Sequence, residues 1–437
     1  MVILLVGATG FLGRRLARAL LAAGHEVVQV QRRLSGPSSA GETEHARLRR
    51  LQGDFTTDHR IGDWLPRLQG VDAVINAAGI LRESGQQTFE ALHVRGPRAL
   101  FEAAVQAGVR RVLQVSALGA NADARSAYHR SKRAADEHLL GLPLAATVVQ
   151  PALLYGTGGA SARLFSRLAV LPWVPVPGSG RQEVQPLHVD DAVQALLALL
   201  DDGAPLGRVE FAGPQAMGLS DFLLTLRRAL GLPPTRVVPI PQAWVSAAAW
   251  LGSHWPGALL DRDTWGMLQR GNTGDAAPVR ALLGHPPRPP AAFVERDQAP
   301  ALRQAAQLEA LLPVLRWSLA LVWLVTAVVS IAVFPREQSL DLLQRAGVPA
   351  AWSPLLLWGA AAFDAVLGVA TLFWHRWRPL WGVQAALIAF YTAVITLRLP
   401  EFWAHPYGPV LKNLPLLALL WLLHALAPPR PPAEGPR

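Results

Sequence analysis

The sequence of 437 residues contains no cysteine. Disulfide bonds, thiolate nucleophiles and cysteine-ligated zinc sites are therefore excluded. Lysine is nearly absent as well: Lys132 and Lys412 are its two occurrences, although lysine and arginine together number 41. Charged residues make up only 16% of the chain, against 51% hydrophobic residues. A chain of this length exceeds what one compact core usually fills, so two domains are expected, and the apolar content indicates more than a soluble protein.

The net charge of +10 comes almost entirely from arginine. A basic balance is typical of proteins that bind nucleic acid or an anionic membrane surface. Because no dense basic run with interleaved aromatic residues occurs, we interpret the charge as a bias toward membrane lipid and expect no nucleic-acid partner. His188 with Asp190 and Asp191 could suggest a metal, but acidic residues are common where a helix begins, so no metal site is assigned.

The first 200 residues alternate short apolar runs with helical stretches, which predicts an α/β fold with a Rossmann-type, doubly wound parallel sheet. A small substrate lobe is expected from about residue 151, so that the first domain covers 1–295, followed by a linker at 296–311. The chain start lacks the basic lead and cleavage site of a signal peptide, so this domain is expected in the cytoplasm. The expected strands are 2–6, 27–30, 71–76, 112–116 and 146–150, and the expected helices include 13–23, 93–107 and 126–140.

From residue 312 onward the pattern changes to long apolar stretches. A membrane-spanning helix needs about 20 apolar residues, so the stretches predict a domain at 312–428 with four transmembrane helices, followed by a tail at 429–437. A buried soluble bundle is the alternative, but tryptophans gather near the ends of the stretches, as is typical of membrane interfaces. The four stretches are 317–334, 346–374, 379–397 and 408–428, and the tryptophans are Trp317, Trp352, Trp374, Trp377, Trp381 and Trp403.

Loop charges predict the orientation of this multi-pass protein. Arg376 and Arg378 lie between the second and third stretches without an acidic neighbour. Positive loops stay on the cytoplasmic side, so the N-terminal domain and the C-terminus are both expected there, in a bacterial-type cytoplasmic membrane. Asp364 would lie inside a spanning helix and needs a partner or a cavity, for which Lys412 is a candidate along with His405 and His424. Asp364 could belong to a quinone or proton site within the bundle, or it could form a structural polar contact between helices. The sequence favours neither interpretation of Asp364 over the other.

A glycine motif follows the first expected strand. Gly7, Gly10 and Gly13 have the spacing G-x-x-G-x-x-G at the start of the first helix. Glycine allows the backbone to approach a pyrophosphate at a helix N-terminus, so this loop, with Thr9, Phe11 and Leu12, predicts a dinucleotide site.

The end of the second strand predicts which dinucleotide binds. An NAD site usually has an acidic residue there, whereas this chain has Arg32 and Arg33. Arginine binds phosphate in a bidentate manner, so NADP(H) is favoured over NAD(H), unless both are ordinary surface arginines. Further assigned positions are Asp54 at the adenine pocket, Asn76, Ala77 and Ala78 at the ribose and nicotinamide wall, and Pro151 after the strand at 146–150.

Tyr128 and Lys132 have the spacing Y-x-x-x-K, which is improbable by accident in a chain with four tyrosines and two lysines. On a helix these residues share one face, so the ammonium group is expected to lower the phenol pKa and to bind the cofactor ribose. Tyr128 would then act as a general acid. Ser116, at the end of the neighbouring strand, is expected to hold the substrate oxygen beside Tyr128.

Together these motifs resemble those of an extended or atypical short-chain dehydrogenase/reductase. Segments 150–159 and 184–191 are similar to the atypical branch related to the NADPH-binding accessory subunit of respiratory complex I, so the resemblance covers about residues 1–295. Residues 312–427 resemble a DoxX-like membrane domain, chiefly in segment 405–413. The chain departs from the family at Ala117, where a second serine is frequent, and at His93, where an asparagine is common.

The resemblance implies a membrane-anchored NADPH-dependent oxidoreductase that reduces a carbonyl or quinone-like lipophilic substrate with Tyr128 as proton donor. Some relatives in this branch bind NADPH without known turnover, so a non-catalytic assembly or sensor protein of a membrane complex is the alternative. A third possibility is that the membrane domain passes electrons to a quinone.

Overall fold

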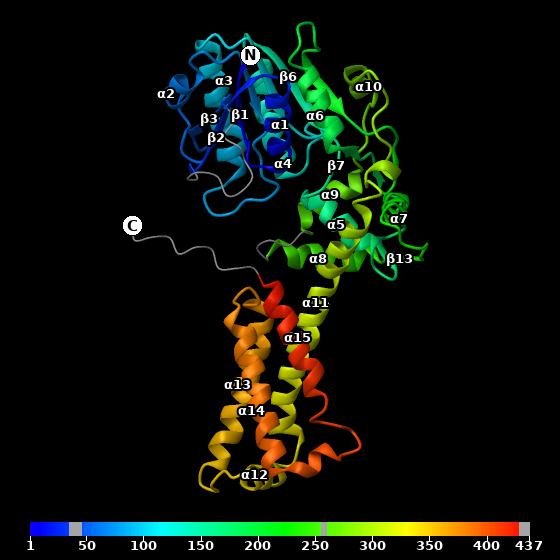
Figure 1. Cartoon of the computed structure of the whole chain (residues 1–437). Helices are drawn as coiled ribbons and strands as arrows, with labels where there is room; N and C mark the ends of the chain where they lie inside the picture. Colours follow the sequence, from blue (N-terminus) through cyan, green and yellow to red (C-terminus); the bar gives the residue numbers. More distant parts are fainter. Residues whose placement is uncertain (35–45, 255–259, 428–437) are drawn as a thin grey trace. The chain divides into compact units, whose positions relative to one another are not determined.

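The computed structural model describes residues 1–34, 46–254 and 260–427, so the expected tail at 429–437 lies outside the described residues. The chain divides into two compact units, Met1–Ala306 and Gln307–Arg437 (Figure 1). Each unit is described by itself below.

A seven-stranded sheet forms the centre of the first unit. Its strand order is β11-β6-β5-β4-β1-β2-β3, and every neighbouring pair is parallel. The predicted doubly wound parallel sheet is therefore confirmed. The strands are β1 (Val2–Val6), β2 (Glu26–Gln31), β3 (Leu48–Gln52), β4 (Ala73–Asn76), β5 (Arg111–Val115), β6 (Ala145–Pro151) and β11 (Gly207–Phe211). Because β1 lies between β2 and β4, the winding direction reverses there, and ligands of such sheets bind at this point.

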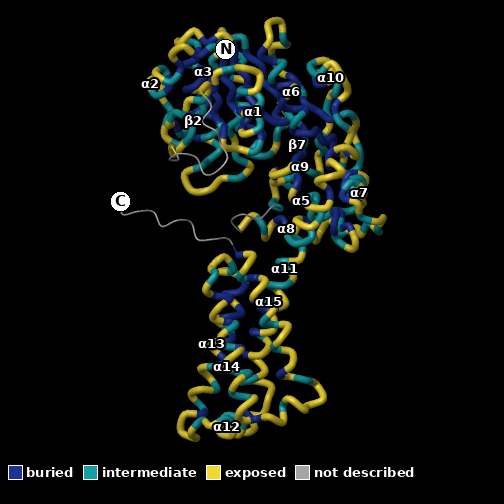
Figure 2. The backbone as a smooth tube through the Cα atoms, viewed as in Figure 1, coloured by how far each residue is buried: buried dark blue, intermediate teal, exposed yellow. Residues whose placement is uncertain are grey.

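Helices cover both faces of the sheet, so the strands are buried on both sides (Figure 2). On one face, apolar side chains of α1 (Phe11–Ala22) and α6 (Val189–Ala198) pack against Ile3 and Leu5. On the other face, α3 (Gly96–Gln106) and α4 (Ala127–Leu140) pack against Leu4 and Val28, together with Trp64 of α2 (Ile61–Trp64). This two-sided burial explains why the strand sequences are continuously apolar.

The helix expected at 93–107 begins earlier, in a π-helical turn at Glu90–Arg95 that leads into α3. Its wide turn places His93 inside the domain, with 1% of its surface exposed. Such turns are frequent at functional sites.

The lobe after residue 151 consists of short helices around a small two-stranded sheet of β8 (Val174–Pro177) and β13 (Val237–Ile240). Buried Arg227 links separate segments of this lobe. Its guanidinium donates hydrogen bonds of 2.6–2.8 Å to the carbonyls of Pro233, Ala169 and Leu171. The lobe helices are α5 (Ala160–Ala169), α7 (Leu219–Ala229), α8 (Gln242–Ser253) and α9 (Arg262–Arg270), whereas α10 (Ala277–Leu283) packs against α6 and β11 at the seven-stranded sheet. Short strand pairs complete it: β7 (Leu154–Tyr155) with β10 (Leu187–His188), and β9 (Glu183–Val184) with β12 (Met217–Gly218).

The second unit is helical, and many of its residues are exposed (Figure 2). Large hydrophobic side chains are frequent among these exposed residues. Three helices are long and apolar enough to cross a membrane, so three of the four predicted spans are supported: Ala299–Val333, Ser353–Phe373 and Pro379–Arg398. The first of them comprises α11 (Ala299–Val328) and a π-helical turn, and the others are α13 and α14. The fourth, α15 (Asn413–Leu426), has only 14 residues, and α12 (Arg336–Arg345) is a short polar helix.

Two expectations about this part of the chain need correction. Residues expected as a linker at 296–311 are helical from Ala299, because good helix formers such as alanine, leucine and glutamine continue into the apolar stretch. Trp381, expected at a membrane interface, is 1% exposed and packs inside the bundle with Trp323 and Leu420.

Candidate active site

The glycine loop connects β1 to α1 at the point where the sheet reverses its winding. Gly7 has φ 82°, and a Cβ there would lie 2.6 Å from the backbone of Ala77 and Ala78. A Cβ on Gly13 would lie 2.1 Å from the Gly7 carbonyl oxygen. Glycine is therefore required at both positions, and the loop is in contact with the end of β4.

The N-terminus of α1 suits a pyrophosphate. Gly10 is the N-cap residue, and within the described part of the chain no side chain caps the first amides of the helix. These amides point toward the loop, where an anion is stabilised by their partial positive charge. Of the neighbours assigned to the site, the Thr9 carbonyl accepts a hydrogen bond from Arg14, the Phe11 ring lies 4.8 Å below Arg15, and Leu12 is buried.

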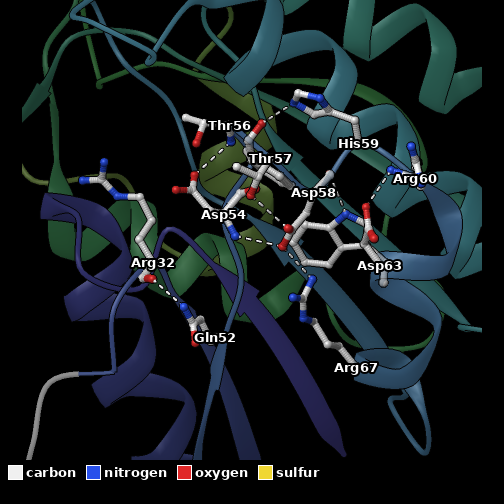
Figure 3. A network of polar contacts seen from close by, with 12 residues as sticks. Arg32, Gln52, Asp54, Thr56, Thr57, Asp58, His59, Arg60, Asp63 and Arg67 are labelled. Carbon is white, nitrogen blue, oxygen red and sulfur yellow. Dashed lines mark hydrogen bonds and ion pairs between the residues drawn. The ribbon is translucent and has the colours of Figure 1, made fainter.

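A network of polar residues lies at the ends of β2 and β3 (Figure 3). Arg32 and Arg33 are both exposed at the end of β2. Asp54 follows β3, where its carboxylate accepts a hydrogen bond from the amide of Thr56, and its own amide donates to Asp58 at 2.9 Å. Asp58 in turn pairs with Arg67 at 2.8 Å. Asp54 is thus held in a fixed turn, with Arg32 in the same region (Figure 3).

Lys132 lies between the ends of β4 and β5. Its ammonium group donates hydrogen bonds of 3.1 Å to the carbonyls of Ala78 and Val115, and its side chain is buried. Burial lowers the pKa of Lys132 to about 8, while the nearby Asp136 carboxylate acts in the opposite direction. Asn76 supports the same edge, since it accepts from the Ala78 amide and donates to Gln114 at 2.7 Å. Pro151 ends the neighbouring strand β6, paired with Phe211 of β11.

Ser116 differs from its expected role. Its hydroxyl donates to the carboxylate of Asp136, and 4% of the residue is exposed. Asp136 itself is fully buried, and burial raises its pKa to about 6 although the Ser116 hydrogen bond and Lys132 oppose this rise. Ser116 is therefore bound by a neighbouring helix instead of presenting its hydroxyl to a substrate oxygen.

The pKa of Tyr128 also differs from its expected direction. Burial, followed by the charge of Asp136, raises the pKa of Tyr128 to about 12, whereas the sequence predicted a decrease caused by Lys132. The reason is that the same burial that brings Lys132 to the site also destabilises a phenolate. The phenol is consequently protonated at neutral pH, which is the form that can donate a proton.

His93 links the segment that follows β4 to α4, the helix that carries Tyr128. Its Nε2 accepts from the Ile80 amide at 3.0 Å, so Nδ1 carries the proton and donates to the Ser131 hydroxyl at 2.9 Å. Ser131 in turn donates to the Tyr128 carbonyl. Burial, with a smaller effect of Lys132, lowers the pKa of His93 to about 2, so the ring is neutral. Its centroid lies 5.6 Å from that of the Tyr128 ring.

Asp136 and Gln114 belong to this site in addition to the residues predicted from the sequence. The spacing contained a signal for Asp136, because Tyr128, Lys132 and Asp136 follow one another at intervals of four and share one face of α4. A charged residue on the core face of a helix needs a partner. Gln114 gave no comparable signal, since its role depends on the pairing of β4 with β5.

A cavity of about 310 Å³ opens beside the start of α4. Its wall includes Ser126 and His129 of the first unit's core, and the exposed side of α9. His129 contacts the Tyr128 ring, with centroids 5.2 Å apart, so His129 lies between the cavity and Tyr128.

In the membrane unit, polar groups lie inside the helical bundle. Asp364 is 5% exposed, and its Oδ1 atom has no hydrogen-bond partner among residues 1–34, 46–254 and 260–427. Lys412, one of the partners suggested for it, is exposed. Gln384 instead accepts from the Trp323 indole at 2.7 Å and donates to Thr371 at 3.0 Å.

Two families match the chain. Residues 3–209 match the NAD dependent epimerase/dehydratase family, and residues 320–421 match the DoxX-like family. Among curated proteins, a ceramide reductase from Caulobacter vibrioides is 31% identical over 259 residues, which is 58% of this chain and 78% of that protein.

The mitochondrial NADH dehydrogenase (ubiquinone) 1 alpha subcomplex subunit 9 of Arabidopsis thaliana is 32% identical over 219 residues, 48% of this chain and 52% of that protein. The chain thus spans about half the length of that relative. Among solved structures, a nucleoside-diphosphate-sugar epimerase from Staphylococcus aureus has a TM-score of 0.55 at 16% identity, covering 67% of this chain and 99% of that one. That similarity concerns the fold alone.

Proposed function

Because this chain belongs to the NAD-dependent epimerase/dehydratase family and joins that fold to a DoxX-like domain, we propose that it is a membrane-anchored, NADPH-dependent reductase. Its substrate would be a lipophilic carbonyl compound, and Tyr128 would be the proton donor. The observation that carries the proposal is the placement of Tyr128 and Lys132 on one face of α4, with the Lys132 ammonium held at the ends of β4 and β5.

Tyr128 and Lys132 would have different roles in the reduction of the carbonyl group. A bound nicotinamide cofactor supplies a hydride. Tyr128, protonated at neutral pH, donates a proton to the oxygen of the carbonyl as negative charge develops there. Lys132 contributes a positive charge beside that oxygen and can hydrogen-bond the cofactor ribose, while the Ala78 and Val115 carbonyls keep it oriented. The Ser116 hydroxyl is hydrogen-bonded to Asp136, so Ser116 has no direct role in the proposed proton transfer.

Preference for the phosphorylated cofactor is part of the proposal. Gln31, Arg32 and Arg33 occupy the end of β2, while the carboxylate of this strand, Glu26, lies at its start. An acidic residue that could bind a free 2′-hydroxyl is therefore absent from positions 31–33, and the two arginines are the proposed partners of a 2′-phosphate. Arginine pairs strongly with phosphate. Arg32→Ala is expected to weaken NADPH binding about tenfold or more while leaving NADH binding nearly unchanged, since a hydrogen bond between charged groups contributes about 1.5–3 kcal/mol.

The lipophilic substrate is inferred from two observations. The membrane-crossing helices keep the enzyme at a lipid surface, and the relative from Caulobacter is named a ceramide reductase. We further infer that the first unit faces the cytoplasm, in agreement with Arg376 and Arg378 between α13 and α14. A cytoplasmic C-terminus is part of this inference and requires that the short helix α15 also crosses the membrane.

The experiment is a titration of detergent-purified full-length protein with NADPH and NADH, followed by NADPH oxidation with lipophilic carbonyl compounds, including ceramide-like ketones. Tyr128→Phe is the test variant and Tyr407→Phe, an exposed tyrosine in the membrane unit, is the matched control. We expect Tyr128→Phe to bind NADPH normally and to lose at least about 99% of turnover, as is typical for a general acid. Equal turnover by Tyr128→Phe and wild type would refute the role of Tyr128.

The similarity to a complex I subunit favours a second candidate, an NADPH-binding protein that assembles with a membrane complex without turnover. It predicts tight NADPH binding, no oxidation with any carbonyl compound, and identical behaviour of the Tyr128→Phe variant. Co-purification of a stoichiometric membrane partner from native membranes would support this candidate over the reductase.

A further inference from the structure

The cavity beside the start of α4 is unusually cationic. Arg125, Arg262 and Arg270 line it together with one acidic residue, Asp263. None of these four side chains forms an ion pair within the described ranges 1–34, 46–254 and 260–427. Three guanidinium groups around about 310 Å³ therefore face solvent with an excess of positive charge.

His129 and Ser126 form the inner wall of this cavity and give it no further charge. The Ser126 hydroxyl contacts His129 Nδ1 at 3.0 Å, and burial together with the Arg270 guanidinium lowers the pKa of His129. The histidine is therefore neutral, and the anion-binding groups of the cavity are its arginines. Because His129 also contacts the Tyr128 ring, a molecule in the cavity lies one side chain away from the proposed proton donor.

The opposite face of α9 packs against an apolar helix, α8. Trp265 of α9 is 5% exposed and packs against Val245 and Ala249 of α8. The outward face of α8 presents Trp244 and Leu251, which are 74% and 62% exposed, and the helix carries no charged residue. Exposed apolar surface of this kind is unusual for a solvated helix and suits contact with acyl chains.

We propose that the cavity binds the phosphate headgroup of an anionic lipid substrate, whose acyl part lies along α8 and whose carbonyl group reaches Tyr128. This proposal rests on the proposed reductase function, which it narrows to anionic amphiphiles. Arginine groups bind phosphate oxygens in a bidentate manner, whereas a neutral lipid offers these three guanidinium groups no negative charge. Arg262 and Arg270 would then determine substrate specificity without touching the NADPH site.

The test measures binding without turnover, so that it remains informative even if no NADPH oxidation is found. Full-length protein in mild detergent is titrated with a fluorescent lysophosphatidic acid and with a fluorescent monoacylglycerol of the same chain length. Inorganic phosphate is added as a competitor. The test variant is Arg262→Gln/Arg270→Gln, and Arg125→Gln is a second, independent variant. Arg280→Gln, an exposed arginine on α10, is the matched control, and NADPH affinity reports on correct folding in every variant.

We expect the lysophosphatidic acid to bind at least about tenfold more tightly than the neutral lipid, because each charged hydrogen bond corresponds to about one factor of ten. The double variant should lose this preference and Arg125→Gln should reduce it, while Arg280→Gln and NADPH affinity stay unchanged. Equal binding of the two lipids, or an undiminished preference in both variants, would overturn the proposal. Inorganic phosphate that binds as tightly as the lipid would also overturn it, in favour of a soluble phosphate ester.

Discussion

Acid should open the region around His93 before it unfolds the rest of the first unit. This buried imidazole is neutral and accepts a hydrogen bond from the Ile80 amide, so protonation of Nε2 would remove the bond and place a charge beside Lys132. The pKa of His93 is lowered from 6.5 to about 2 in the folded protein. In the open state the ring recovers its ordinary pKa, so protons bind more strongly to the open state.

The loss of stability of the closed state follows from the difference in the pKa of His93 between the closed and open states. The closed state is fully stable above pH 6.5, and it loses about 1.4 kcal/mol for each pH unit below that value, until the pH approaches about 2. At about pH 4.5 the loss is about 2.7 kcal/mol, which corresponds to about a hundredfold larger open population. The segment affected comprises the end of β4 and the start of α4, because His93 bridges Ile80 and Ser131.

Hydrogen exchange followed by mass spectrometry measures this opening in the full-length protein, corrected for intrinsic exchange rates at each pH. Peptides covering residues 77–95 are compared between wild type and His93→Asn from about pH 4.5 to about pH 7.5. Asp136 and His129 titrate nearby, but they are present in both proteins, so the difference between the two isolates His93. A difference in opening free energy that does not change with pH would refute the reasoning.

Three further substitutions test the loop, the lobe and the membrane bundle. Gly13→Ala should abolish NADPH binding, because its Cβ would lie 2.1 Å from a loop carbonyl oxygen. Gly62→Ala, whose Cβ meets nothing within 4 Å, should bind NADPH normally in the same fluorescence titration, and binding by Gly13→Ala would contradict the proposed loop geometry. Arg227→Gln should destabilise the first unit by about 2–4 kcal/mol, since buried carbonyls lose a charged donor, and an unchanged apparent Tm would argue against this. Gln384→Leu leaves the Trp323 indole without its acceptor and should lower the thermal stability of the bundle in detergent by about 1–2 kcal/mol, whereas an unchanged or higher midpoint would count against the network.

Most of the fold was predictable because its signals are local. The apolar strands, the glycine loop and the long apolar helices each depend on residues close together in the chain. The limits of these elements were less predictable. The helix α11 begins at Ala299, inside the expected linker, since tertiary context and helix propensity extend it beyond the apolar stretch. Trp381 was assigned to a membrane interface by its position alone, but packing places it in the bundle core.

The candidate site divides in the same way. Residue spacing alone indicates that a glycine loop follows β1 and that Tyr128 and Lys132 share a helical face, because both features lie within one chain segment. Three other features depend on packing between distant segments: the carbonyls of two strands that hold Lys132, the Asp136 carboxylate that binds Ser116, and the burial that raises the pKa of Tyr128. Only the tertiary structure also brings α9 against the start of α4 to form the arginine-lined cavity. Burial and hydrogen bonding depend on which distant segments pack together, and no spacing rule within one segment contains that information.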